Sequence, residues 1–280
     1  MENENVKEEI IDIKEEVINE AAINLLPEKS RRLYEASYES FKKWCAENDV
    51  KNIDENTMLT YFDEKSKTFK SSTLWAQYSM IKSCMALHEN IDVSQYKKLI
   101  SFLKRNSDGY TAKKSKIFNR EQVNSYLSKA DDDVHLMRKV ALIIGVAGAC
   151  RADELINLSV DNINDLGSSL RIRFPHAQKK VSRTFVITSR EGEIDVLDLY
   201  RKYARLRPNK TNHRRFFIFY KDGKCTVQPV GKNTMGKVPN VIAKWLKLPN
   251  PERYTAHCFR RSSATVLADA DIDISTNLKW

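Results

Sequence analysis

The stretch Tyr254–Arg261, which reads YTAHCFRR, places His257 and Arg260 three residues apart. Residues at this spacing lie on the same face of a helix. A second arginine, Arg151, lies far upstream in residues 148–155, GACRADEL, where an apolar helix is expected to end in a turn. Arginine binds phosphate oxygens through a two-pronged guanidinium, and histidine titrates near neutral pH. Two arginines and a histidine that converge from separate elements can therefore hold a phosphodiester and move a proton at it.

The charge of the chain is distributed unevenly. The 280 residues have a formal net charge of +10, yet residues 1–26 hold eight acidic residues and only two lysines, so the rest is more basic than the whole. A basic body of this kind is typical of nucleic-acid-binding proteins, although an excess of charge also keeps proteins in solution. The composition of residues 1–26 predicts a disordered acidic tail.

Several classes of protein are disfavoured by the sequence. No apolar run approaches the roughly 20 residues of a membrane-spanning helix, and the acidic N-terminus lacks the pattern of a secretion signal. The five cysteines are scattered and include no Cys-x-x-Cys pair, which predicts reduced thiols inside a cell and neither disulfides nor zinc. They are Cys45, Cys84, Cys150, Cys225 and Cys258.

Residues 27–104 predict a helical domain. Hydrophobic periodicity indicates four helices, of which the second is capped by Asp54 and the third begins at Ser71 or Ser72. His88 is expected to be a helix-end residue rather than a ligand, and the aromatic stripe of the first helix to be core rather than a base-stacking surface. That stripe, in residues 28–48, comprises Leu33, Tyr34, Tyr38, Phe41, Trp44 and Cys45.

Residues 105–116 are predicted to form a basic linker between two domains. The turn residues 106–109, NSDG, break the helical period, and Lys113, Lys114 and Lys116 follow. A tether of this charge can lie along a DNA backbone, although exposed lysines are also ordinary in linkers.

Residues 117–280 predict a second domain that mixes helices and short strands. Asn119 is expected to cap its first helix with Gln122 completing a capping box, and an apolar, buried helix follows at 134–149. Alternating residues indicate strands at 170–174 and 184–187, joined by a basic loop. The other expected elements are a helix at 194–206, a strand at 216–220 with a hairpin turn at 221–224, and helices at 238–248 and 256–270.

The order of these parts resembles the tyrosine recombinases and integrases. The shared features are a helical domain, a basic linker, an arginine at a helix boundary followed by Glu-Leu, a β-hairpin with lysines, and His-x-x-Arg on a late helix. The sequences 148–155, GACRADEL, and 257–265, HCFRRSSAT, are similar to Crypton-type recombinases carried by eukaryotic transposons. The resemblance implies a mostly helical α+β fold. Its parts would be a SAM-like core-binding domain and a mixed α/β catalytic domain that is truncated.

The resemblance also implies a chemistry. In this family a tyrosine attacks a DNA phosphate and forms a 3′-phosphotyrosine without a metal ion or other cofactor, so protein cations stabilise the transition state. Arg151 and Arg260 would hold the non-bridging oxygens, and His257 would be the acid–base partner. Lys179 would protonate the leaving oxygen, with Lys180 the next choice. The implied DNA contacts are Lys113, Lys114, Lys116, Lys180 and Arg261.

One departure from the family concerns the nucleophile. The family's second His or Trp and its tyrosine nucleophile would fall at positions beyond Trp280, and Tyr254 lies on the wrong side of the His-x-x-Arg motif. The expectation is therefore a fragment of a longer protein or a chain that has lost its active C-terminus. On this basis the chain alone would not cleave DNA.

The expected partner is double-stranded DNA, bound in the nucleus by a homo-oligomer such as a synaptic tetramer, with no membrane and no small-molecule substrate. The acidic tail also fits an alternative, a non-catalytic DNA-binding or adaptor protein descended from a transposon. A third interpretation, a helical interaction protein without a DNA role, requires the ordered match of motifs to be chance.

Overall fold

The computed structural model describes residues 26–111, 113–174, 182–189 and 194–268. The chain divides into two compact units, Met1–Ala112 and Lys113–Trp280. Apart from its last residue, the expected acidic tail lies outside the described residues, as do Lys179 and Lys180. Among the described helices, none combines the length and the apolar character that crossing a bilayer requires.

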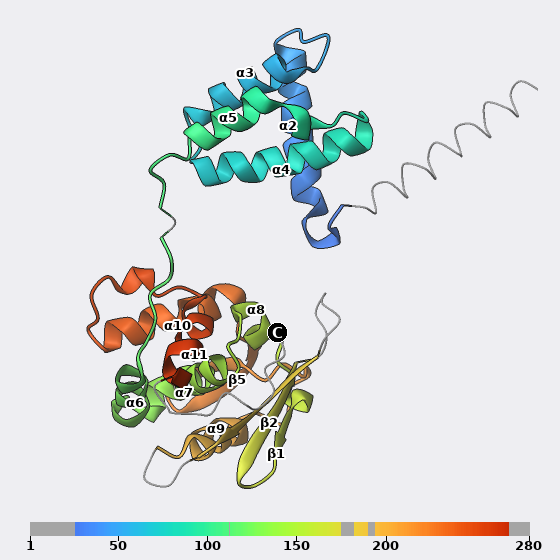
Figure 1. The fold of residues 1–280 in the computed structure, drawn as a ribbon. Coiled ribbons are helices and arrows are strands. Elements are labelled where there is room, and N and C mark those ends of the chain that lie inside the picture. Colours follow the sequence, from blue (N-terminus) through green and yellow to red (C-terminus); the bar gives the residue numbers. More distant parts are fainter. Residues whose placement is uncertain (1–25, 112, 175–181, 190–193, 269–280) are drawn as a thin grey trace, which may run out of the picture. The chain divides into compact units, whose positions relative to one another are not determined.

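The described part of the N-terminal unit is helical (Figure 1). A short 3₁₀ turn, η1, precedes the first α-helix, and a second 3₁₀ turn, η2, lies between the last two α-helices of the unit. The elements are η1 (Glu28–Ser30), α2 (Arg31–Glu47), α3 (Glu55–Ser66), α4 (Ser71–His88), η2 (Val93–Gln95) and α5 (Lys97–Arg105). The four predicted helices are confirmed, and α4 begins at Ser71.

The predicted cap and most of the predicted core are also confirmed in this unit. The side chain of Asp54 accepts a hydrogen bond of 2.8 Å from the backbone N–H of Thr57 and so begins α3. Phe41 is fully buried, and its ring meets that of Tyr61 edge-on at 5.0 Å. Leu33, expected on the inward stripe, is instead 63% exposed. Consecutive residues of an α-helix point about 100° apart, so Leu33 faces away from the direction in which the half-buried Tyr34 points.

The described part of the C-terminal unit combines helices with two small sheets, which confirms the predicted mostly helical α+β fold. The capping box predicted at Asn119 and Gln122 is present at the start of α6. The helical elements are α6 (Arg120–Lys129), α7 (Asp132–Ala147), α8 (Ala152–Asn157), η3 (Val160–Asn162), α9 (Val196–Arg205), α10 (Lys232–Trp245), η4 (Pro251–Arg253) and α11 (Cys258–Ala268).

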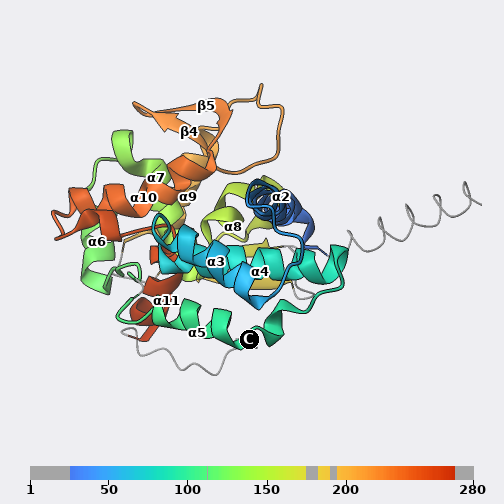
Figure 2. The same ribbon diagram turned by 90° about the horizontal axis from the view of Figure 1, so that it is seen from above.

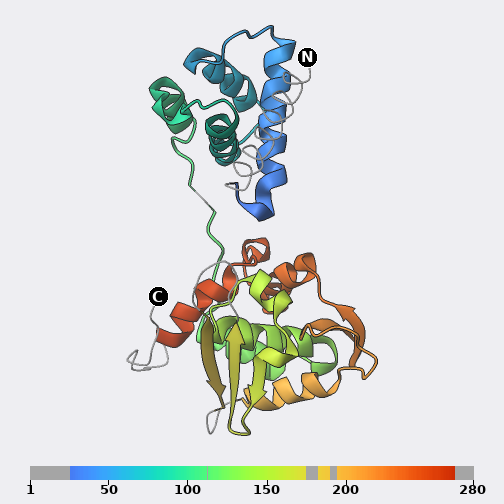
Figure 3. The same ribbon diagram turned by 90° about the vertical axis from the view of Figure 1, so that its right-hand side faces the viewer.

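One sheet has three antiparallel strands in the order β1 (Ile163–Asp165), β2 (Ser169–Phe174), β3 (Arg183–Thr188), as Figure 3 shows. The register between β2 and β3 pairs Phe174 with Arg183. The predicted hairpin is also confirmed, as β4 (Ile218–Lys221) and β5 (Lys224–Pro229), visible in Figure 2. Both residues of its turn, Asp222 and Gly223, have positive φ, which suits a two-residue hairpin loop.

Helix α7 is the centre of the C-terminal unit, because α9, α10, α11, β3 and β4 all pack against it. Its buried residues include the unbroken run Val140–Val146 near its C-terminal end. The single buried cation of this helix, Lys139, is 2% exposed and is paired with Asp132 at 2.7 Å. The prediction of a buried apolar helix is thus confirmed, with a start two residues earlier than expected.

Helix α10 begins earlier than predicted. The expected start was Val238, but the helix runs from Lys232 with Gly231 at its N-cap. Pro239 lies inside both the predicted and the observed helix, and the residues before Val238 include Gly236, a residue type that usually weakens helices. Strand β1 was not predicted because its three residues are too few to show an alternating pattern.

Candidate functional site

The turn after α7 fixes the backbone at Arg151. The N–H of Cys150 donates to the carbonyl of Gly145 at 2.8 Å, and the N–H of Ala149 donates to Val146 at 3.1 Å. Ala149 has φ +46°, so this is a Schellman ending in which alanine occupies the left-handed position usually taken by glycine. The chain then enters α8 with Arg151 at its N-cap and the Arg151 side chain 55% exposed.

The second element of the site is the first turn of α11. His257 is exposed and directly precedes the helix, and Arg260 lies half-buried within it. Helix α11 packs on α7 through Phe259, at a point where α7 has Gly145. A Cβ at Gly145 would lie 2.6 Å from Cδ2 of Phe259, so only glycine permits this approach.

The close approach brings Arg260 toward the turn that carries Arg151. Burial raises the pKa of the Cys150 thiol to about 12, and the charges of Arg183 and Arg260 act in the opposite direction. Arg151, at the N-cap of α8, and Arg260, in α11, thus lie on elements that both adjoin the C-terminal end of α7.

Glu154 connects two arginines at this end of the unit. Its Oε2 accepts the backbone N–H of Arg151 at 2.6 Å, and its Oε1 lies 3.9 Å from Nη1 of Arg151. The same carboxylate is 3.1 Å from Nη2 of Arg183, whose guanidinium also lies 5.3 Å from the ring centroid of Phe174. Arg183 is thus held by an ion pair and a cation–π contact.

Arg183 was missed as a site residue by sequence reasoning, which placed it in a basic loop. The strand pattern could have identified Arg183. If the alternation of the strand is extended by one residue, Arg183 becomes the partner of Phe174 in the last pair of the β2–β3 ladder. Lys179 and Lys180, expected between these strands, lie outside the described residues. Their predicted roles stay predictions.

Residues 113–118 lie along α11 and η4 within the C-terminal unit, and we call them the strap. The N–H of Lys116 donates to the carbonyl of Arg253 at 2.9 Å, and the N–H of Phe118 donates to Oγ of Ser262 at 2.8 Å. Oγ of Ser115 accepts the N–H of Thr255 at 3.1 Å. The strap therefore supports the turn from which His257 projects.

Two of the cations predicted to contact DNA, Arg261 and the strap residue Lys116, donate hydrogen bonds to backbone carbonyls of the C-terminal unit. The guanidinium of Arg261 donates to the carbonyl of Ser115, and Nζ of Lys116 donates to the carbonyl of Pro249 at 2.9 Å. Lys113 and Lys114 are exposed. Arg261 is also exposed and Lys116 is half-buried, so Lys116 is the least accessible of these four cations to an external anion.

All five tyrosines of the C-terminal unit fall among the described residues, and each is buried. Tyr254, three residues before His257, stacks on Phe118 with ring centroids 4.9 Å apart. Burial raises the pKa of its hydroxyl. The other four are Tyr126, Tyr200, Tyr203 and Tyr220. None of them presents its side chain at the surface in this arrangement.

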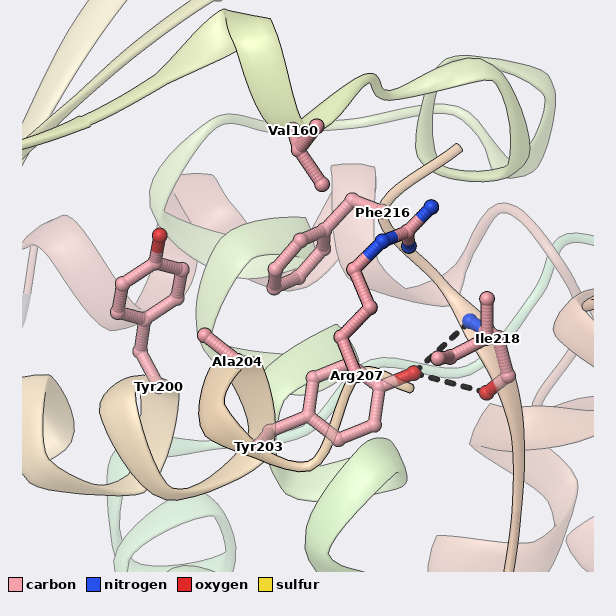
Figure 4. Close-up of a pocket in the computed structure, with 7 residues that line it drawn as sticks. All are labelled: Val160, Tyr200, Tyr203, Ala204, Arg207, Phe216 and Ile218. Atoms are coloured by element: carbon pink, nitrogen blue, oxygen red, sulfur yellow. Dashed lines mark hydrogen bonds between the residues drawn. The ribbon is translucent and has the colours of Figure 1, made fainter. Parts of the chain in front are cut away.

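A small cavity of about 140 Å³ lies between α9 and β4, away from the arginines of the site. Figure 4 shows the hydroxyl of Tyr203 donating to the carbonyl of Ile218 at 2.8 Å and accepting its N–H at 2.9 Å. Arg207 in the cavity wall donates to the carbonyls of His213 and Arg215. The hydroxyl of Tyr203 and the guanidinium of Arg207 therefore already have hydrogen-bond partners within the protein.

Residues 116–277, more than half of the chain, match the model of the phage integrase family. The chain therefore belongs to this family, the tyrosine recombinases. The comparison with curated protein sequences found no match.

The fold recurs in solved structures. A dimer of lambda integrase residues 75–356 bound to a COC′ core site is 12% identical, with a TM-score of 0.57 over 88% of this chain and 82% of that chain. Tn1549 transposon integrase in complex with circular intermediate DNA is 14% identical, with a TM-score of 0.55 over 84% and 80%. XerH recombinase bound to difH is 15% identical, with a TM-score of 0.55 over 83% of this chain. This chain spans about two thirds (66%) of that XerH chain.

Proposed function

We propose that this chain is a DNA-binding recombinase of the transposon type, similar to Crypton-type recombinases, that acts on double-stranded DNA in the nucleus. The observation that carries the proposal is the close approach of Phe259, the neighbour of Arg260, to Gly145 near the end of α7, because the turn that leads to Arg151 begins at that end of the helix. Two guanidinium groups that converge there would form a site for a phosphodiester.

The partner in this proposal is supported by charge and by the relatives. The chain has a net charge of +10, and basic proteins bind nucleic acid chiefly through the phosphates. The XerH, lambda integrase and Tn1549 integrase structures contain their proteins with DNA, and the lambda integrase is a dimer. By analogy we propose that this chain assembles on duplex DNA as a homo-oligomer, up to a synaptic tetramer.

The proposed chemistry is a transesterification at phosphorus. Arg151 and Arg260 would hold the non-bridging oxygens, and His257, exposed beside Arg260, would move a proton at the reacting phosphate. Lys179 or Lys180 would protonate the leaving oxygen. Donors of this kind are each worth a factor of about 10² to 10³ in rate, because they meet charge that develops in the transition state.

In this mechanism the attacking tyrosine is not one of the five buried tyrosines of the C-terminal unit. All five tyrosines of the C-terminal unit are buried, so attack by one of them would require its packing to be disrupted. We therefore expect the chain to grip DNA without forming a covalent adduct on its own. The nucleophile would come from a tyrosine outside these five.

The test is equilibrium binding of labelled duplex DNA, measured by fluorescence anisotropy at about 50 mM and about 200 mM salt. We expect affinity that falls steeply with salt, and a decrease of about tenfold or more for Arg151→Ala and for Arg260→Ala, since each removes a charge-assisted contact worth about 1.5–3 kcal/mol. Arg171→Ala, which removes an exposed arginine of β2, is the matched control and should retain affinity. An affinity that does not change with salt concentration, or the absence of binding, would contradict the proposal.

An assay with nicked duplex DNA, analysed on a denaturing gel, distinguishes the proposed recombinase from the alternative, a non-catalytic adaptor protein. An adduct that requires Arg151 and Arg260 would show strand cleavage by a tyrosine of this chain and correct our expectation about the five buried tyrosines. Salt-dependent binding that is indifferent to both arginines would favour the alternative, a non-catalytic transposon-derived DNA-binding protein.

A further inference from the structure

Three metal-ligating side chains of different kinds lie together in the N-terminal unit. Glu35 is on α2, and Cys84 and His88 are four residues apart on α4, hence on one face of that helix. Helices α2 and α4 pack against each other, and one donor atom from each residue lies within 4.8 Å of the other two. Nε2 of His88 is 3.4 Å from Oε2 of Glu35.

Two of the donor atoms at this cluster are buried without a hydrogen-bonding partner. Oε1 of Glu35 is buried and accepts no hydrogen bond. Cys84 is 0% exposed, and among the described residues its thiol makes no hydrogen bond. A buried carboxylate oxygen without a partner is costly. Burial, and then the charge of Glu35, also raises the pKa of Cys84 to about 11.

The contact between His88 and Glu35 explains only part of this arrangement. It occupies Oε2 of the carboxylate and leaves Oε1 and the thiol of Cys84 without partners. A cation that binds oxygen, nitrogen and sulfur together would satisfy all three side chains. The imidazole is also held in place, because the ring of Tyr38 stacks on it at 5.0 Å and the Tyr38 hydroxyl donates to Glu89 at 2.5 Å.

We propose that Glu35, Cys84 and His88 form a zinc-binding site that joins α2 to α4. A thiolate, an imidazole and a carboxylate are the ligands that Zn²⁺ takes in proteins, whereas Mg²⁺ and Ca²⁺ prefer oxygen alone. Zinc bonds of about 2.0–2.3 Å place ligand atoms roughly 3.5 Å apart. The three donors lie within 4.8 Å of one another, and the His88–Glu35 pair is already at 3.4 Å. A water molecule would take the fourth position.

Zinc binding would change the chemistry of the cluster. The proton of the Cys84 thiol passes to solvent when the Zn–S bond forms, and the cation balances the resulting thiolate and the carboxylate of Glu35. Because α2 and α4 supply the ligands, the ion would stabilise their packing in the folded state only. The inference stands apart from the proposed recombinase chemistry and revises the expectation that none of the cysteines binds zinc.

The test is titration of the full-length, reduced, metal-free chain with Co²⁺, which reports on the same ligands through its absorption. We expect one equivalent to bind with a thiolate-to-cobalt band in the near ultraviolet and the visible bands of tetrahedral cobalt. Zn²⁺ should abolish both signals. Thermal unfolding followed by circular dichroism should shift to higher temperature as Zn²⁺ is added.

Three variants make the test specific. Cys84→Ser should lose the thiolate band, and His88→Gln should weaken Co²⁺ binding and remove the zinc-dependent thermal shift. Cys45→Ser is the matched control, since Cys45 is a buried cysteine of α2 in the same core but outside the cluster. It should behave as the parent. No thiolate band in the parent chain, or a band that survives in Cys84→Ser, would overturn the proposal, and circular dichroism shows whether each variant is folded.

Discussion

Nη2 of Arg183 lies 3.1 Å from Oε2 of Glu154, and this carboxylate also holds Arg151. The pair connects β3 to the N-terminal end of α8, so the sheet and the arginine-bearing turn are tied at one point. The side chain of Glu154 is only 23% exposed, so solvent screens these contacts only partly. Arg183 is therefore a positioning residue, which acts on Arg151 through Glu154.

Glu154→Ala is expected to lower the free energy of unfolding by about 1–2 kcal/mol. It removes the acceptor of the Arg151 N–H, which is a helix-capping bond, and leaves two guanidinium groups without their shared anion. Urea unfolding measures the change. Asp153→Ala is the matched control, because that side chain is 61% exposed and pairs with Lys232 at the surface. Equal decreases in the two variants would show that Glu154 has no special role.

Gly145→Ala should separate α7 from α11. The added Cβ would lie 2.6 Å from the ring of Phe259, an overlap that costs about 1–3 kcal/mol and displaces the helix that carries Arg260. We expect lower stability, although alanine is the better helix former, and weaker DNA binding. Gly236→Ala in α10 is the control, since its Cβ would meet Ala256 at an ordinary 3.8 Å. The combination with Phe259→Leu should recover part of the stability and part of the affinity.

The spacing of residues in the sequence was enough to predict most of the helices and strands that carry the candidate site residues. Arg151 follows a run of apolar residues that predicted the buried helix α7, and Arg260 lies on the predicted late helix, which begins at Cys258, one residue after His257, so the expected helical pairing of His257 with Arg260 is not formed. The two small sheets followed from alternating residues and a turn, apart from the three-residue β1. These features depend on neighbours along the chain, which a sequence displays directly.

Features that depend on distant partners could not be predicted. The role of Arg183 rests on Glu154, and that of Arg261 on the carbonyl of Ser115, which is 146 residues away in sequence. Glu35 and Cys84 meet only because α2 packs on α4. Each of these contacts is set by tertiary packing, on which local periodicity carries no information.

Ala149→Gly is expected to stabilise the protein by about 1 kcal/mol. Ala149 has φ +46°, a left-handed conformation that costs an L-residue with a Cβ about 1–2 kcal/mol and costs glycine little. The matched control is Ala147→Gly, two residues earlier in the last turn of α7, where the same change should destabilise by up to about 1 kcal/mol. Thermal unfolding of both variants should show shifts of opposite sign.

The pH dependence of stability should include a contribution from Asp165. Its carboxylate accepts hydrogen bonds of 2.7 and 2.8 Å from Arg201, which hold its pKa at about 2. The pKa in the unfolded chain is about 3.9. Because the folded pKa is the lower one, this stabilisation is complete above about pH 4 and is lost as the pH falls toward about 2.

Asp165→Asn tests this contribution. The variant should be less stable than the parent at about pH 5, and the difference in urea unfolding should shrink as the pH falls through this window. Arg201→Gln removes the partner from the other side and should show the same narrowing. A difference that stays constant with pH would mean that the folded state does not lower the pKa of Asp165.

Substitution of the exposed lysines of the strap and substitution of Arg261, which bonds to the strap, should have different effects. Arg261 donates to the carbonyl of Ser115, so Arg261→Ala is expected to lower stability by about 1 kcal/mol. Lys113 and Lys114 are exposed, so their joint replacement by alanine should leave stability unchanged. It should weaken DNA binding and reduce the slope of log affinity against log salt by about 1–2, because each lysine would neutralise one DNA phosphate. If Arg261→Ala instead weakened DNA binding at unchanged stability, Arg261 would bind a phosphate directly, as the family resemblance implies.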